Sequence, residues 1–110
     1  MFKTVNFTGA VAASTALVAA PATGKQILVK KIVVSVAKVQ SGKVLKLYEH
    51  GSSVPFFVVD LGTAGATEFD PSTNSNGDYY PLTAATALDY EADSTTGNTN
   101  CSIVLNYGIT

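Results

Sequence analysis

The sequence predicts an all-β protein, a single-domain antiparallel β-sandwich of about eight strands. Apolar and polar residues alternate with a period of two in several runs, which is typical of strands with one buried face. Clusters of Gly, Pro, Asn, Asp and Ser separate these runs at short and regular spacing, as turns do in sandwiches and barrels. The chain has 110 residues, which suits one domain over 1–110.

The N-terminal part admits two interpretations. The run KTVNFT forms a good strand, with Val5 and Phe7 on one face. The next stretch, GAVAASTALVAAPATGKQILVKKIVV (9–34), has the small apolar residues and the Ala-Ala-Pro-Ala of a secretory signal with its cleavage site. It also fits two strands joined by a turn at 21–25. Because Ser14 and Thr15 interrupt the apolar run, we favour the two strands.

The remaining strands follow from residue type and alternation. β-branched residues are frequent in KIVVSVAKV (31–39) and VPFFVVDL (54–61), and such residues favour strands. The other three expected strands alternate, and they are KVLKLYE (43–49), LDYEAD (88–93) and CSIVLNY (101–107). In the run 88–93 we expect Asp89, Glu91 and Asp93 on a solvated outer face. A short helical turn near 83–87 is the one expected exception to strand and loop.

Composition and charge limit the classes of partner that the chain is expected to have. Charged residues make up 14% of the chain, the formal net charge is -1, and there is no Arg. Arg is the usual reader of phosphate and guanine, so we expect no nucleic-acid partner. No apolar run approaches the roughly 20 residues that span a bilayer, so we expect no membrane partner. The lysines all lie within 3–46 and the acids within 49–93. Two arrangements follow from this separation. One is a basic face and an acidic face that attract neighbouring copies, and the other, which we favour, is strands from both halves that mix the charges in space.

The sequence offers no catalytic constellation, and we expect neither an enzyme nor a cofactor. His50 is the single histidine and Cys101 the single cysteine, so histidine clusters and internal disulfides are excluded. The two residues lie in an expected turn and an expected strand, with no third residue to orient them. Cys101 is better interpreted as a small buried hydrophobe.

One loop, DPSTNSNGDYY (70–80), has the composition of a weak calcium candidate. The oxygen-bearing side chains at short spacing are those of Asp70, Asn74, Asn76 and Asp78. Calcium takes six to eight oxygen ligands, but the bidentate Glu of an EF-hand loop is missing. We therefore favour an Asx-rich turn and expect no metal. Tyr79 and Tyr80 follow directly, and neighbouring strand residues point to opposite faces, so one is expected to pack inward and the other to face an interface.

The order of features resembles a known group of proteins. The segments STALVAAPATGKQILVKKIVVSVA, GKVLKLYEHGSSVPFF and GDYYPLTAATALDYEADSTTGNTNCSIVLNYGI are similar to small β-sandwich virion proteins of tailed bacteriophages, above all capsid decoration proteins. The resemblance implies a jelly-roll-like sandwich on the outside of a head shell, made in the host cytoplasm. It also implies the major capsid protein as partner and a homotrimer as the oligomer. No functional residue transfers, because these proteins act through surfaces.

Within this resemblance the N-terminal residues 1–20 are either a docking arm or ordinary first strands. The residues expected at an interface are Val5, Phe7, Tyr79 and Tyr80. Two alternatives use the same fold class. One is a tail or head-fibre module that binds a host-surface glycan. The other is a secreted carbohydrate-binding sandwich, which requires the signal interpretation of 9–34 and usually a Trp platform, whereas this chain has no Trp.

Overall fold

The computed structural model of the protein describes residues 1–71, 79–93 and 100–110. This described part consists of strands joined by turns and loops, and it holds no helix long and apolar enough to cross a membrane. The strands are β1 (Phe2–Phe7), β2 (Val11–Val18), β3 (Ile27–Lys38), β4 (Val44–Glu49), β5 (Phe57–Asp60), β6 (Gly65–Phe69), β7 (Tyr80–Pro81), β8 (Leu88–Ala92) and β9 (Asn100–Ile109).

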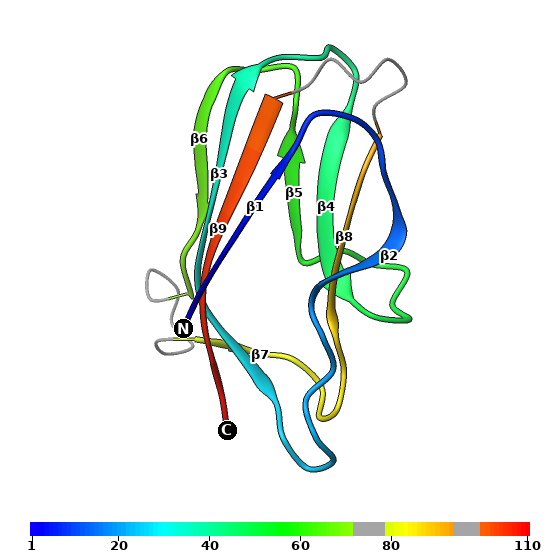
Figure 1. The fold of residues 1–110 in the computed structure, drawn as a ribbon, viewed down its shortest axis with the longest axis vertical. Helices are drawn as coiled ribbons and strands as arrows, with labels where there is room; N and C mark the ends of the chain where they lie inside the picture. The colour runs from blue at the N-terminus through cyan, green and yellow to red at the C-terminus, as the bar shows by residue number, and fades with distance from the viewer. Residues whose placement is uncertain (72–78, 94–99) are drawn as a thin grey trace.

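Two antiparallel sheets face each other and form a sandwich (Figure 1). Sheet A has the order β1-β9-β3-β6, with the two-residue β7 also paired to β3, and sheet B has the order β2-β8-β4-β5. Apart from β7, the pairs β1–β9, β2–β8, β3–β6 and β4–β5 are nested inside one another along the chain. A long antiparallel hairpin that rolls up in this way is a jelly roll. The predicted all-β sandwich is therefore confirmed.

The core lies between the sheets and follows the alternation in the sequence. Leu45 and Leu47 of β4 and Ile103 and Leu105 of β9, from the opposing sheet, are fully buried and belong to one core cluster. An aromatic group closes one part of the core, where the Phe56 ring stacks on Tyr80 at 4.8 Å between centroids. Burial of about 25 cal/mol per Å² of apolar surface makes this interior the main source of stability.

The stretch 9–34 belongs to the fold as strands. Residues 11–18 form β2, which pairs with β8, and β3 begins at Ile27. The turn between them is closed by a hydrogen bond from Lys25 N to Ala22 O, with Gly24 at a φ of 81° that favours glycine. The expected helical turn near 83–87 is not a helix. A non-helical turn lies at residues 84–85 instead.

The charges are not mixed, and the expectation that they would be is wrong. The strands of sheet A carry four lysines and one acid, which are Lys3, Lys30, Lys31, Lys38 and Glu68. The strands of sheet B carry one lysine and four acids, which are Lys46, Glu49, Asp60, Asp89 and Glu91. The cause is the topology, because the lysine-rich β3 and the acidic β8 run in opposite sheets. Sheet A is thus basic and sheet B acidic.

Candidate functional site

The outer face of sheet B carries a hollow of about 360 Å³, here called the polar hollow. Its floor is formed by Lys46, Tyr48 and Glu91 from the central strands β4 and β8. One wall is the part of β2 that holds Ala13 and Ser14, and the other wall is the turn at 51–55. A sheet face gives a flat floor, so the depth comes from these two walls.

The first wall exists because β2 bulges away from β8. Val11 pairs with Ala92 and Thr15 with Tyr90, so the segment between Val11 and Thr15 is longer than its partner segment on β8. Extra residues on one strand bend that strand out of the ladder. The bulge is closed internally by a hydrogen bond of 2.7 Å from Thr15 Oγ1 to Ala12 O.

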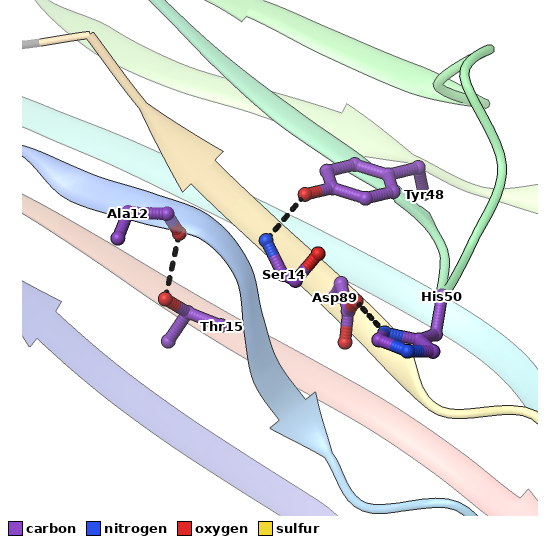
Figure 2. Close-up of polar contacts among 6 residues, drawn as sticks. All are labelled: Ala12, Ser14, Thr15, Tyr48, His50 and Asp89. Atoms are coloured by element: carbon purple, nitrogen blue, oxygen red, sulfur yellow. Dashed lines mark hydrogen bonds and ion pairs between the residues drawn. The ribbon is translucent and has the colours of Figure 1, made fainter.

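Ser14 sits at the top of the bulge in a left-handed conformation, with a φ of 62°. Its N–H donates a 2.7 Å hydrogen bond to the Tyr48 hydroxyl, which reaches across β8 from β4 (Figure 2). Non-glycine residues in this conformation cost about 1–3 kcal/mol and persist only where the surroundings hold them. Since the phenol oxygen accepts this bond, its own proton remains able to donate into the hollow.

Asp89 is buried beneath this arrangement, so the expectation that it is solvated is wrong. Its side chain is 1% exposed although it points to the outer face of sheet B, opposite Tyr48. Figure 2 shows the carboxylate between the bulge and the His50 ring. Asp89 Oδ2 lies 2.6 Å from His50 Nδ1, whereas Oδ1 is buried without a hydrogen-bond partner among the described residues. A carboxylate only accepts, so Nδ1 is the donor.

Lys46 and Glu91 face each other across β4 and β8 at the floor of the hollow. Both side chains are half-buried. Within the described residues, neither makes a hydrogen bond or an ion pair. The floor therefore presents one strong donor and one strong acceptor that the described part of the chain leaves without a partner.

The outer face of sheet A is different in character. It carries a shallow hollow of about 280 Å³, here called the apolar hollow, lined by Phe2, Lys31, Val33, Val104 and Asn106. The Phe2 side chain is 75% exposed. Within the described residues, the one ion pair on this face joins Lys31 to Glu68 at 3.5 Å, and both side chains are about half exposed. Apart from Lys31, the hollow itself is lined by neutral side chains.

Strand β1 borders this face and has an open edge, which means here that no described strand pairs with its outer side. Met1 and Tyr107 exchange both of their backbone hydrogen bonds, and the pairing with β9 continues without a register shift from Phe2 to Phe7. Hydrogen-bonded and non-bonded pairs alternate in an antiparallel ladder. The backbone groups of Phe2, Thr4 and Asn6 therefore point away from β9, toward the open edge.

The four residues expected at an interface separate into two pairs. Phe7 lies in the core, 6.3 Å from the Tyr90 ring between centroids, and Val5 packs against the core. These two side chains serve the protein's own interior, so an interface on β1 would use the other side of the strand. Of the tyrosines, Tyr80 packs inward and Tyr79 is 46% exposed, as the alternation predicts.

The remaining candidates are the calcium loop and Cys101. Asn74, Asn76 and Asp78 of the calcium candidate lie outside the described residues, whereas Asp70 is described and has an interaction of its own. No group of three or more His, Cys, Asp or Glu side chains within the described ranges is placed to hold a metal. Cys101 is buried, and burial raises the pKa of its thiol to about 11, which makes it a poor nucleophile.

No protein-family model matches the chain, and no curated protein matches its sequence.

Proposed function

We propose that the chain is a structural virion protein that binds the outside of a tailed-phage capsid and stabilises the shell by bridging capsid subunits. Two features support this proposal. The sequence resembles small capsid decoration proteins, and the jelly roll is a fold that viral capsid proteins use, as lectin domains also do. Because a fold does not imply a function, the argument must come from a surface.

The observation that carries the proposal is the open edge of β1 beside the apolar hollow. Sandwiches usually protect their edge strands with bulges, prolines, charges or short length. Two of the other edges are protected in these ways, since β2 is bulged and β5 has four residues after Pro55, and the edge strand β6 is shorter than β1 and carries one charge, Glu68. β1 is regular and carries a single charge, Lys3.

A partner strand added to β1 would gain backbone hydrogen bonds from Phe2, Thr4 and Asn6. Side chains of the same partner that extend from this strand over the outer face of sheet A would cover the exposed Phe2 ring and the valines of the apolar hollow, where Lys31 is the one charged lining residue. The partner we propose is the major capsid protein, with copies of this chain arranged as a homotrimer. Many copies that bind only the assembled shell stabilise it by mass action.

Immunogold electron microscopy on intact particles of the virus that encodes the chain tests this function. Antibody raised against the purified chain is expected to label heads evenly. Label confined to tails or fibres would overturn the decoration function and favour a host-attachment module. An absence of label on all particles would overturn a virion function altogether.

A further inference from the structure

We propose that the polar hollow on sheet B is a saccharide-binding site, in which Lys46 and Glu91 hold adjacent hydroxyl groups of one sugar ring. This inference goes beyond the proposed capsid function, because it concerns the opposite sheet from the β1 edge and does not depend on what β1 binds. It rests on the hydrogen-bonding groups that the hollow offers and on how they are held.

The two charged groups of the floor complement a polyol. A lysine ammonium only donates hydrogen bonds and an ionised carboxylate only accepts them. A hydroxyl does both, so two neighbouring hydroxyls can accept from Lys46 and donate to Glu91 without bringing a charge into the hollow. A ligand with a single net charge would be attracted by one of these side chains and repelled by the other.

The groups around the floor are also hydrogen-bonding groups that suit a polyol. The Tyr48 hydroxyl accepts from Ser14 N–H at 2.7 Å, which orients the phenol and leaves its proton to donate toward the ligand. Ser53 contributes a further hydroxyl at the rim. The volume of about 360 Å³ falls at the low end of the range of small-molecule sites, so the hollow suits one or two sugar rings.

The two walls that carry these groups are held in place by hydrogen bonds within the protein. The bulge that carries Ser14 is closed by its own hydrogen bond, from Thr15 Oγ1 to Ala12 O. The opposite wall is anchored by the hydrogen bond from His50 N to Ala87 O and by the His50–Asp89 contact. A site whose walls are already ordered loses little conformational entropy when a ligand binds.

The test is a titration of the isotope-labelled protein with single saccharides. Binding is monitored through changes in amide chemical shifts in two-dimensional NMR spectra. The probes are glucose, galactose, mannose and N-acetylglucosamine, with glycine as a zwitterionic comparison. We expect at least one sugar to shift the amides of Ser14 and the 51–53 turn. The Lys46→Met and Glu91→Gln variants are each expected to bind that sugar about tenfold more weakly, because each removes a hydrogen bond to a charged group, and tenfold corresponds to about 1.4 kcal/mol.

The matched controls are Lys31→Met and Glu68→Gln, which remove the corresponding cross-strand pair on sheet A and should leave sugar binding unchanged. All four variants should keep the dispersed amide spectrum of the folded protein. The proposal is overturned if none of the sugars shifts an amide, if the shifts map to another surface, or if glycine alone binds. It is equally overturned if the sheet A variants weaken binding as much as the sheet B variants.

Discussion

Replacing His50 with Ala should destabilise the protein more than replacing its partner Asp89 with Ala. The Asp89 carboxylate is 1% exposed, and the His50 ring is its one hydrogen-bonding partner among the described residues. His50→Ala therefore leaves a buried charge without a partner. Asp89→Ala removes that charge together with its unsatisfied Oδ1, and it leaves behind a histidine whose side chain is 59% exposed and free to hydrogen-bond with water.

The size of the expected loss in stability follows from how much of the Asp89 and His50 side chains is exposed. Removing one partner of a fully buried ion pair costs about 3–5 kcal/mol, because the other charge stays buried. Since more than half of the His50 side chain is exposed, solvent screens this pair and reaches the space that Ala would leave. We therefore expect His50→Ala to lower the free energy of unfolding by about 1–3 kcal/mol, with a smaller loss for Asp89→Ala.

Urea denaturation of the wild type, both single variants and the double variant measures these differences as a cycle. The double variant should be no less stable than Asp89→Ala alone. Ser53→Ala, in the same turn, is the matched control and should change stability by less than about 0.5 kcal/mol. The reasoning is refuted if His50→Ala is as stable as the wild type, or if the two single losses simply add.

Two further predictions concern buried side chains. The pKa of the Cys101 thiol is raised from 9.0 to about 11 by burial, so between these pH values the unfolded chain loses a proton that the folded chain keeps. Stability should fall with rising pH in this window, by about 2–3 kcal/mol in total, and a Cys101→Ala variant should show that much less decline in urea denaturation across the same pH range. Tyr80→Ala opens the aromatic cluster with Phe56 and Phe69 and should cost about 2–4 kcal/mol. Tyr79→Ala should cost less than about 0.5 kcal/mol, and equal losses from both tyrosines in thermal unfolding would contradict the assigned orientations.

Much of the fold is predictable from local pattern, because most strands are marked by alternation or β-branched residues and most turns by their residues. The short strands β6 and β7 carry no such mark and are not predicted from the sequence. Leu45 and Leu47 face the core as the alternation of 43–49 predicts. The nested pairing is not marked in this way. β1 pairs with β9 at the far end of the chain, and such non-local pairing depends on the packing of the whole sandwich. The jelly-roll-like expectation came from the resemblance and not from the pattern.

The candidate site is harder to predict because its key features are tertiary. Ser14 takes a positive φ in a run of small residues without glycine, so nothing in the local sequence marks the bulge. Asp89 alternates like a solvated residue, yet the bulge, the Tyr48 ring and His50 cover it. The separation of lysines from acids along the chain is visible in the sequence, but only the strand order shows that it places opposite charges on the two sheets.

Binding of the purified chain to isolated head shells, compared between the wild type and Thr4→Pro, tests the central claim most directly. Thr4 N–H faces the open edge of β1, so proline there removes a donor for an added strand without breaking a hydrogen bond to β9. Thr4→Ala is the matched control, and thermal unfolding verifies that both variants fold. The account predicts that Thr4→Ala sediments with the shells like the wild type and that Thr4→Pro does not. Equal binding by a folded Thr4→Pro variant would contradict docking through the β1 edge.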